Sequence, residues 1–425
     1  MLDIRLLRER PSFFVERLAA RGDASASETV ARILAFDEAR RRAETEAQGL
    51  KAERNRVSKE LGARKAKGED IAAASAEVRT MGERIAELDA EAAAADAGQR
   101  GALLETPNVP HEACPLGRTA DDNPVVREWG TKPTFDFKPK SHIEVGTVLG
   151  LLDFERATKI SGAGFVVYTG KGARLERALI NFLLDLHTRE HGYTEMGVPF
   201  VVKPEALVGT TQLPKFADQQ YHCERDDLYL VPTAEVPVTN LHREEIVAMA
   251  QLPIKYAAYT PCFRSEAGAA GIGTRGLIRM HQFDKVELVK ICLPEHSMAE
   301  LDALTADAEN VLQLLGLSYR TIELCTGDLG FGSTKTYDVE IWAPGQNAFL
   351  EVSSCSNFAD YQARRMNLRY KDAEGKNRYC HTLNGSGTAL ARLYVAILES
   401  GQRADGSVHV PDALQPYFGA AEIRN

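Results

Sequence analysis

Apolar residues recur every seven positions in the N-terminal quarter of the chain. In residues 71–95 one apolar row repeats at seven, and a second row follows it three residues later. The first row is Ile71, Val78, Ile85 and Ala92, and the second is Ala74, Met81, Leu88 and Ala95. This a/d spacing, sustained over four heptads, predicts one helix of a coiled coil.

The preceding residues carry a less regular form of the same pattern. Residues 27–97 contain no proline and one aromatic residue, Phe36, and they are rich in the helix formers Ala, Glu and Arg. One row is Phe36, Ala43, Leu50 and Val57, and its companion is Ile33, Arg40, Ala47, Arg54 and Leu61. The two arginines can cover a seam with their aliphatic stems while their guanidinium groups reach water.

Residues 62–70, with the sequence GARKAKGED, interrupt both patterns. They contain two glycines, and Glu69 and Asp70 favour the first turn of a following helix. We therefore predict an antiparallel helical hairpin over about 27–97, with its tip near Lys65–Gly68. Each helix of about 30 residues would be roughly 45 Å long.

The pattern changes after the hairpin. Six prolines between 98 and 140 interrupt any long helix. From 141 onward, short β-rich runs alternate with amphipathic helices such as 173–191, which predicts an α+β domain on one large sheet. We predict a helical arm over 1–105, a linker over 106–140 and a sheet-containing domain over 141–425.

Composition excludes several classes of protein. Hydrophobic residues make up 44% and charged residues 26%, as in ordinary globular chains. No apolar run reaches the roughly 18 residues of a membrane span, and the start, MLDIRLLRERP, lacks the apolar core of a signal peptide. The seven cysteines are scattered without a C-x-x-C pair, which argues against a disulfide framework and a cysteine-rich zinc site. We expect a cytoplasmic protein with no membrane segment and no zinc.

Charge argues against a general nucleic-acid binder, because the net value is −9. The net charge, however, differs between the two halves of the hairpin. Residues 27–67 carry eleven basic and seven acidic side chains, or +4, whereas 69–97 carry two basic and eight acidic ones, or −6. Cross-helix charge pairing explains this split, and composition favours that interpretation. The alternative is a basic helix and tip that face a polyanion.

Two clusters in the second half combine charge with strand-like sequence. Thr233-Ala234-Glu235 would place a hydroxyl and a carboxylate on one strand face, which suits a ligand ammonium, although a capping threonine is the simpler interpretation. Further on, Arg264 and Glu266 precede a glycine-rich loop, and 277–289 reads as a second strand. Phe283, Lys285 and Glu287 would share one face of it. Arginine can bind a phosphate, glutamate can accept a hydrogen bond from an exocyclic amine, and phenylalanine can stack on a base. The alternative interpretation is a salt-bridged hairpin with no ligand.

Two further clusters lie nearer the C-terminus. Glu351 and Ser353 would share a face of a regular strand, and such oxygen ligands suit Mg²⁺ bound to phosphates; an ordinary amphipathic strand is the alternative. Residues 384–388, NGSGT, precede a helix in which Arg392 lies about one turn in, so backbone N–H groups could meet an anion. The P-loop, G-x-S-x-G and H-E-x-x-H motifs are absent.

Together these motifs resemble the bacterial-type seryl-tRNA synthetases, a class II aminoacyl-tRNA synthetase family. FRSEAG followed by TRGLIRMHQFDKVE resembles motif 2, with TAE upstream, and LNGSG with AR downstream resembles motif 3. The helix at 173–191 leading to Gly197-Val198-Pro199 resembles motif 1, which forms the family's dimer interface. The resemblance covers essentially the whole chain. It implies an α+β fold: an N-terminal antiparallel two-helix coiled-coil arm plus a class II catalytic domain, an antiparallel sheet flanked by helices.

The resemblance also implies residue roles. Arg264 matches the α-phosphate clamp, Glu266 the adenine reader, and Phe283 the ring that stacks on adenine. The catalytic residues are Arg264, Glu351 and Arg392, the last of which matches the γ-phosphate arginine. The ATP contacts are Arg264, Ser265, Glu266, Phe283, Glu351, Val352, Ser353, Ser354 and Arg392, with Mg²⁺ on Glu351 and Ser354. The serine contacts are Thr233, Ala234, Glu235, Glu287 and Ser386. The tRNA contacts are Arg54, Arg64, Lys65 and Lys67 on the arm and Arg275 in the motif 2 loop, which departs from the family around Ile272.

The implied reaction is ATP-dependent serylation of tRNA. Serine would react with ATP to give seryl-adenylate, and the 3′ end of tRNA(Ser) would then receive the serine; the tRNA for selenocysteine is a second candidate. We expect a homodimer. The alternatives are a related ligase that loads an amino acid onto a carrier protein, which would lack the arm, and an inactive paralogue. The latter would have lost residues among Arg264, Glu266, Glu351 and Arg392, all of which are present.

Overall fold

The computed structural model describes residues 1–266 and 276–425. The chain forms two compact units. The first comprises residues 1–19 and 23–107, and the second comprises residues 20–22 and 108–425. The first is helical, and the second is built on a large sheet.

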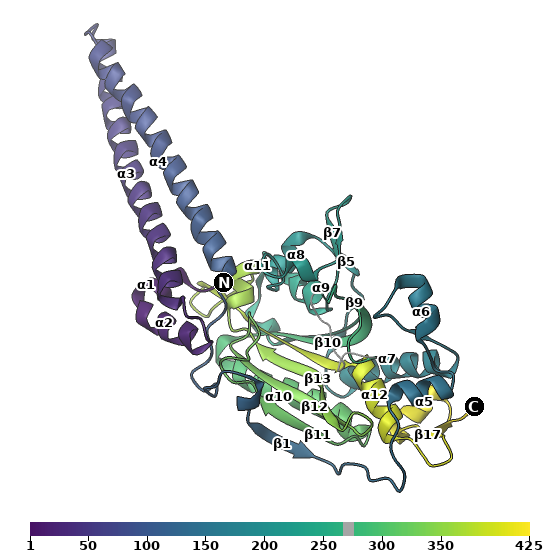
Figure 1. Ribbon diagram of the computed structural model, residues 1–425. Helices are drawn as coiled ribbons and strands as arrows, with labels where there is room; N and C mark the ends of the chain where they lie inside the picture. Colours follow the sequence, from purple (N-terminus) through teal and green to yellow (C-terminus); the bar gives the residue numbers. More distant parts are fainter. Residues whose placement is uncertain (267–275) are drawn as a thin grey trace. The chain divides into compact units, whose positions relative to one another are not determined.

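The first unit is dominated by two long helices, α3 (Ala26–Ala66) and α4 (Ala72–Glu105), which run side by side in Figure 1. Two short helices, α1 (Ile4–Glu9) and α2 (Pro11–Ala20), precede them. The residues of both predicted rows in α4 are buried or half-buried, and Leu88 packs with Ala43 and Ala47 of α3. The predicted helical hairpin is therefore confirmed.

The turn of the hairpin is shorter than the predicted break over 62–70. Helix α3 continues through Gly62 to Ala66, and the chain reverses between Lys67 and Ile71, where Gly68 has a φ of 76°. An exposed glycine inside a helix costs only about 1 kcal/mol relative to alanine, and strong helix formers surround Gly62. One glycine alone therefore does not end the helix.

The base of the hairpin holds a buried carboxylate. Asp37 is 2% exposed and accepts a hydrogen bond of 2.9 Å from Arg8 of α1 and one of 3.2 Å from Arg40. Phe36 lies against Gly98, where a Cβ atom would stand only 2.5 Å from the ring. As expected, Arg40 covers part of the seam while its guanidinium group pairs with Glu44 at 2.9 Å. These contacts fix the register of α1, α3 and α4.

In the described part of the second unit, eight strands form one sheet in the order β1-β11-β12-β13-β16-β10-β9-β4. Neighbouring strands are antiparallel except for the edge pair β4 and β9. Their bounds are β1 Val125–Trp129, β4 Thr194–Glu195, β9 Ile254–Phe263, β10 Gln282–Cys292, β11 Tyr319–Glu323, β12 Lys335–Ala343, β13 Ala348–Asn357 and β16 His381–Ala389. Figure 1 shows strands β11, β12 and β13 side by side. Strand β1 lies inside the segment predicted as a linker, so part of 106–140 belongs to the sheet.

Helices cover one face of this sheet. Helices α7 (Lys171–Arg189) and α12 (Leu390–Ser400) share a hydrophobic core with Val286 of β10 and Val339 of β12. Helix α10 (Ser297–Leu314) packs against Leu288. Val286 and Leu288 of β10 point toward the helices. Because side chains alternate along a strand, Lys285 and Glu287 point to the opposite face. The core therefore lies under the helices, and charged side chains occupy the other face.

Smaller elements complete the second unit. The helices are α5 His142–Val148, α6 Phe154–Ser161, α8 Pro204–Gly209, α9 Glu235–Thr239, α11 Tyr361–Met366 and α13 Gln415–Phe418. The short strands are β2 Leu152–Asp153, β3 Val167–Tyr168, β5 Val201–Val202, β6 His222–Cys223, β7 Leu228–Leu230, β8 Ile246–Val247, β14 Arg369–Lys371, β15 Asn377–Tyr379, β17 Val408–His409 and β18 Glu422–Ile423. All seven cysteines are free thiols, as expected. In the described ranges, every helix is too short or too polar to cross a bilayer.

Candidate active site

Two adjoining cavities open on the charged face of the sheet. The larger has a volume of about 340 Å³ and the smaller about 280 Å³. Among the residues of the larger cavity are Arg264, Glu266, Leu277, Arg279, Phe283, Lys285, Glu351, Ser386 and Arg392. Among those of the smaller are Thr233, Glu235, Arg264, Lys285, Glu287, Glu351, Ser354, Asn384 and Ser386. Four residues, Arg264, Lys285, Glu351 and Ser386, line both, so the two cavities meet at charged groups.

Arg264 and Glu266 lie beyond the end of their strand. Strand β9 ends at Phe263, so the prediction that the two residues share a strand face is wrong. A backbone φ of 49° at Glu266 turns the chain instead, and both side chains still reach the larger cavity. Arg264 Nε donates to the Pro232 carbonyl at 3.3 Å, and its guanidinium carbon lies 5.2 Å from the Phe283 ring centroid. Ser265 faces elsewhere, since its hydroxyl donates to the Asp218 carbonyl at 2.8 Å.

Strand β10 presents three polar or aromatic side chains to the cavities, as predicted. Phe283 lines the larger cavity, Glu287 the smaller and Lys285 both. Lys285 forms a buried ion pair with Glu287. Glu287 also accepts a hydrogen bond of 2.9 Å from the Thr233 hydroxyl and one of 3.4 Å from the Asn384 amide. The carboxylate is therefore held in place by three neighbours.

Residues 233–235 form a turn into helix α9, so the predicted strand is wrong here. The Thr233 hydroxyl accepts a hydrogen bond of 3.2 Å from the Glu235 backbone N–H, which closes a side-chain turn just before α9, whose N-cap residue is Ala234. Pro237 falls in the first turn, where a helix tolerates proline. Thr233 and Glu235 line the smaller cavity, whereas Ala234 is fully buried in a hydrophobic cluster.

Glu235 is a buried carboxylate beside a second one. Burial, together with the negative charge of Glu287, raises the pKa of Glu235 to about 7, while a hydrogen bond from Gln362 opposes the shift. That bond, from Gln362 Nε2 to Glu235 Oε1, is 2.7 Å long. Near neutral pH this cavity therefore holds a carboxylate that a ligand ammonium would stabilise in its charged form.

Strand β13 contains a bulge, so Glu351 and Ser353 do not share a face as they would on a regular strand. Val339 pairs with Ser353 and Glu340 pairs with Glu351, which leaves Val352 as an extra residue. Val352 is buried in the hydrophobic core, and Ser353 donates to the Ser386 carbonyl at 2.6 Å. The bulge brings Glu351 and Ser354 to the smaller cavity instead.

Residues 384–388, the glycine-rich sequence before α12, belong to strand β16. Two of these positions require glycine because there is no space for a side chain. A Cβ atom at Gly385 would lie 2.9 Å from Cys355 Sγ, and one at Gly387 would lie 2.7 Å from His187 Nε2. His187 donates from Nε2 to the Gly387 carbonyl at 2.9 Å, and burial lowers its pKa to about 4. Ser386, between the two glycines, lines both cavities.

Arg392 lies in the first turn of α12 and ties that helix to β13. Its Nη1 donates to the Glu351 carbonyl at 2.6 Å and lies 3.6 Å from Glu351 Oε2. The guanidinium group remains partly exposed to the larger cavity. Arg264 and Arg392 thus bring two positive charges to one cavity, which suits an anion with several phosphates.

The oxygen ligands at Glu351 and Ser354 fit a divalent cation carried by phosphates. Asp338 of β12 pairs with Ser354, and its Oδ1 is buried without a hydrogen-bond partner among the described residues. Burial and the charge of Glu351 raise the pKa of Asp338. In residues 1–266 and 276–425 no three His, Cys, Asp or Glu side chains form a metal site by themselves. Mg²⁺ bound to a nucleotide needs only one or two protein oxygens, so the donor set fits that ion.

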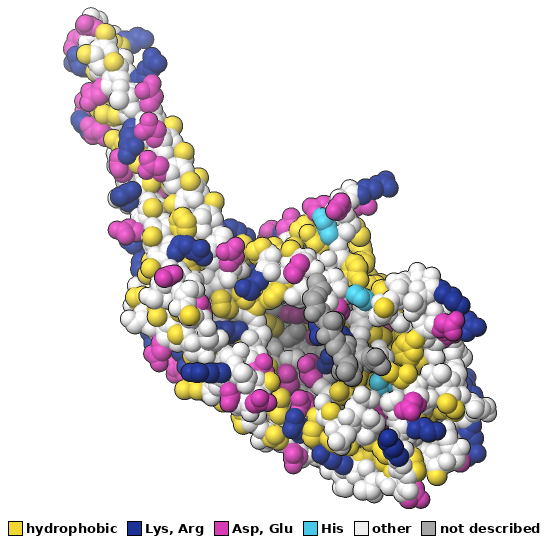
Figure 2. Space-filling view, viewed as in Figure 1, with side chains coloured by type: hydrophobic (Ala, Val, Ile, Leu, Met, Phe, Trp, Pro, Cys, Tyr) yellow, Lys and Arg dark blue, Asp and Glu magenta, His cyan; other side chains and the backbone are white. Residues whose placement is uncertain are grey.

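The predicted tRNA contacts of the arm lie on α3 and its turn. Arg64 is paired with Glu69 at 2.9 Å, and Lys65 and Lys67 are exposed. Cross-helix ion pairs also form, such as Lys51 with Asp89 at 2.8 Å and Arg84 with Glu46 at 3.0 Å. Figure 2 shows both signs of charge interspersed along the hairpin. Ion pairing explains part of the charge split, and within the described ranges Arg54, Lys65 and Lys67 form none of these pairs. Arg275 lies outside the described residues.

Some site residues escaped the sequence analysis. Arg279 pairs with Glu266 at 2.5 Å, and Gln362 of α11 donates a hydrogen bond to Glu235. The segment Gly330–Ser333 also lines the smaller cavity. These residues stand in short loops or helices without periodicity. Only the alternation of basic residues after the motif 2 loop could have indicated Arg279.

Comparison with known proteins agrees with this geometry. A family model described as the seryl-tRNA synthetase N-terminal domain matches residues 1–110, and one described as the tRNA synthetase class II core domain (G, H, P, S and T) matches residues 220–401. A serine–tRNA ligase of Akkermansia muciniphila is 59% identical, and the match covers 100% of this chain and 99% of that protein.

Solved structures support the same assignment. The crystal structure of seryl-tRNA synthetase from Pyrococcus horikoshii complexed with ATP has a TM-score of 0.95 and 38% identity, covering 100% of this chain and 99% of that one. The cytoplasmic serine–tRNA ligase of Naegleria fowleri in complex with AMP has a TM-score of 0.89 and 30% identity, with the same coverage. The predicted α+β fold with a helical arm is confirmed. The chain belongs to the seryl-tRNA synthetase family of class II aminoacyl-tRNA synthetases.

Proposed function

We propose that the two cavities divide the substrates of a serine–tRNA ligase, with ATP in the larger and L-serine in the smaller. The observation that carries this proposal is their shared boundary at Arg264, Lys285, Glu351 and Ser386. Phe283 and two arginines suit a base and phosphates, whereas Glu235, Glu287 and Thr233 suit a small amino acid. The boundary is where the serine carboxylate would meet the α-phosphate.

The reaction has two steps. The serine carboxylate attacks the α-phosphate of ATP, which gives seryl-adenylate and pyrophosphate, and the ribose hydroxyl at the tRNA 3′ end then attacks the acyl carbonyl. In this proposal Arg264 neutralises charge on the α-phosphate, and Arg392 holds the γ-phosphate. Glu266 hydrogen-bonds to adenine and Phe283 stacks on it. Glu351 and Ser354, with Asp338 on the neighbouring strand, would hold Mg²⁺ carried by the nucleotide, and the ion would supply further neutralisation of the phosphate charge.

Serine is proposed as the substrate because several hydrogen-bonding side chains meet in the smaller cavity. Thr233, Glu287 and Asn384 form a linked set of hydrogen-bonding groups. Alanine lacks the hydroxyl and would leave such groups without a partner. A deficit of this kind discriminates by roughly 10⁴ or more. This argument favours a ligase specific for a hydroxyl amino acid over one that accepts any small side chain.

The pKa of Glu235 provides a test of the serine site. Glu235 is charged above pH 7 and neutral below it, and only the charged form attracts the serine ammonium. Lowering the pH from 8 to 6 reduces the charged fraction about tenfold, so the KM for serine should rise about tenfold. The KM for ATP should change less than twofold. Steady-state ATP–pyrophosphate exchange across this pH range measures both.

Glu235→Gln isolates the responsible group. This variant should have a high KM for serine at pH 8 that no longer depends on pH, and an unchanged KM for ATP. Glu112→Gln, which removes the charge of an exposed carboxylate, is the matched control and should behave like the wild type. A KM for serine that is flat between pH 6 and 8 in the wild type would exclude Glu235 as the ammonium ligand.

The helical hairpin is proposed to bind the tRNA. Three observations support this: the match of residues 1–110 to the family's N-terminal domain, the +4 charge of residues 27–67, and the exposed Lys65 and Lys67 at the turn. Arg54 and Arg64 complete the proposed contact set, together with Arg275. We propose an arm over 1–105, a linker over 106–140 that includes the sheet strand β1, and a catalytic domain over 141–425.

We also propose a homodimer that works in the cytoplasm. Exposed apolar side chains on segments before and after α7, namely Val148, Ile160, Phe200 and Val201, are the kind of surface that a second copy covers. Seven free thiols fit a reducing compartment. The tRNA for selenocysteine is proposed as a second acceptor by family resemblance alone.

A further inference from the structure

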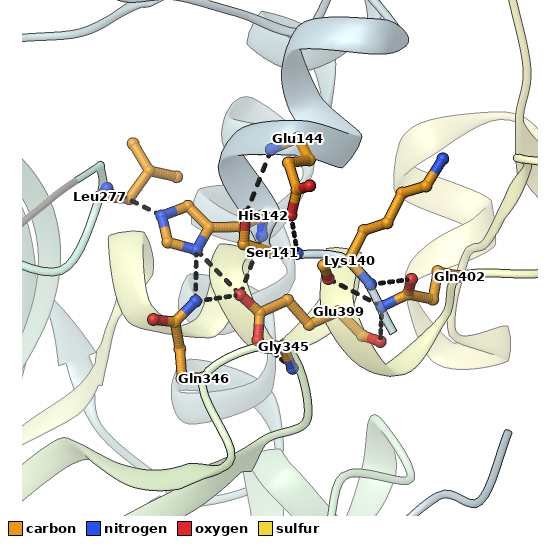
Figure 3. A network of polar contacts seen from close by, with 9 residues as sticks. All are labelled: Lys140, Ser141, His142, Glu144, Leu277, Gly345, Gln346, Glu399 and Gln402. Carbon is orange, nitrogen blue, oxygen red and sulfur yellow. Dashed lines mark hydrogen bonds and ion pairs between the residues drawn. The ribbon is translucent and has the colours of Figure 1, made fainter. Parts of the chain in front are cut away.

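His142, the first residue of α5, is buried behind the wall of the larger cavity. Its exposed fraction is 1%. Its Nε2 lies 3.2 Å from the backbone N–H of Leu277, and its Nδ1 lies 2.9 Å from Glu399 Oε1. Figure 3 shows the ring between Leu277 on one side and Glu399 on the other. Leu277 itself lines the larger cavity.

These partners determine which ring nitrogen carries the proton. A backbone N–H can only donate, so Nε2 must accept from Leu277 and carries no proton. Nδ1 therefore carries the proton and donates it to Glu399. Because Nδ1 is a donor, the 3.5 Å approach of Gln346 Nε2 brings two donors together and is not a hydrogen bond. His142 is thus a neutral ring with one fixed orientation.

Glu399 anchors the ring to two further segments. Besides the ring, its carboxylate accepts from the His142 backbone N–H at 2.9 Å, from Gln346 Nε2 at 2.8 Å and from the Gly345 N–H at 2.9 Å. Glu399 is on α12, two turns after Arg392, and residues 345–346 form the turn before β13, which carries Glu351. One buried carboxylate therefore joins α5 and the turn at 345–346 to α12. Helix α12 and strand β13 carry Arg392 and Glu351 of the larger cavity.

The packing leaves no room for this arrangement to shift. Gly276 has a φ of 71°, and a Cβ atom there would lie 2.3 Å from His142 Nε2. A Cβ atom at Gly345 would lie 2.9 Å from the Glu399 carboxylate. The chain thus approaches the imidazole and the carboxylate as closely as glycine permits. Such contact is expected where a backbone segment must be held in one position.

We propose that His142, oriented by Glu399, is a positioning residue for ATP. It holds the Leu277 N–H and with it the segment Leu277–Met280, which forms one wall of the larger cavity. His142 does not line either cavity itself. The inference rests on the proposed placement of ATP in the larger cavity. Loss of the bond to Leu277 should therefore weaken ATP binding and spare serine binding.

Two substitutions separate positioning from a general structural role. In His142→Asn, the shorter amide can still donate to Glu399 but cannot reach Leu277. In His142→Gln, the longer side chain can place its carbonyl oxygen near the position of Nε2. We expect His142→Asn to raise the KM for ATP about tenfold in exchange assays, with the KM for serine within twofold of wild type. His142→Gln should recover the KM for ATP to within about threefold.

His381→Asn is the matched control. His381 lines neither cavity, and its Nδ1 forms a hydrogen bond of 2.9 Å with the Ser297 hydroxyl. This substitution should lower the melting temperature without changing the KM for ATP. Phe283→Ala tests the placement of ATP and should raise that KM. If Phe283→Ala has no effect, the placement of ATP is wrong. If Phe283→Ala raises the KM but His142→Asn does not, or if the two His142 variants are equally impaired, positioning by His142 is wrong.

Discussion

Replacement of Arg264 by alanine should reduce serine-dependent ATP–pyrophosphate exchange by about a thousandfold or more. Within residues 1–266 and 276–425, Arg264 is the one positive charge lining both cavities that has no carboxylate partner, since Lys285 is paired with Glu287. Its guanidinium group is held by the Pro232 carbonyl and the Phe283 ring. Removing it leaves the α-phosphate without its nearest counter-charge as the carboxylate attacks.

The control variants for Arg264 separate charge from geometry. Arg264→Lys keeps the charge but cannot make two parallel hydrogen bonds, so it should recover only a small part of the activity. Arg225→Ala removes an exposed arginine elsewhere on the second unit and should leave exchange unchanged. A melting temperature close to that of the wild type would show that Arg264→Ala is folded. Near-normal exchange by such a folded variant would refute the proposed role.

Shortening the helical hairpin should separate the two steps of the reaction. Replacing residues 51–86 by a short Gly-Ser turn removes Arg54, Arg64, Lys65 and Lys67. It keeps the layer of Ala43, Ala47 and Leu88 and the buried Asp37 at the base. We expect serine-dependent exchange within twofold of wild type, because both cavities belong to the second unit. Aminoacylation of tRNA(Ser) should fall at least a hundredfold in kcat/KM.

The salt dependence of tRNA binding gives an independent measure. Loss of basic contacts should reduce the slope of log Kd against log salt, because fewer counterions are released. Circular dichroism should show the helix content expected after the loss of 36 residues, most of them helical in α3 and α4. If the shortened protein charged tRNA(Ser) normally, the hairpin would have no part in tRNA recognition.

The sequence predicted features that repeat along the chain. Predicting the heptads of α4 required only the period of a helix, and each predicted position is buried or half-buried. The face shared by Phe283, Lys285 and Glu287 required only the alternation of a strand. Such patterns are local, so they can be recognised without the rest of the fold.

Features that depend on neighbouring strands could not be predicted in this way. The bulge at Val352 is a change in the register between β12 and β13, so it depends on both strands. Nothing in the local sequence of β13 indicates it. The glycine-rich sequence before α12 suggested backbone N–H groups that meet an anion, but Gly385 and Gly387 lie in β16, where Cys355 and His187 leave no space for a Cβ atom. Residues 233–235 suggested a strand, but the hydrogen bond from the Glu235 N–H to Thr233 closes a turn that leads into α9. For the bulge and the two glycines, the residues that cause the local structure lie elsewhere in the chain. At 233–235 the backbone turns between two apolar runs.

The central claim is that the smaller cavity selects serine for reaction with ATP. The most direct measurement is ATP–pyrophosphate exchange with each of the twenty amino acids in turn. We predict exchange with serine and a kcat/KM for alanine at least about 10⁴-fold lower, because alanine has no hydroxyl to hydrogen-bond with the polar groups around Glu287. Equal or faster exchange with alanine, threonine or any other amino acid would contradict this account.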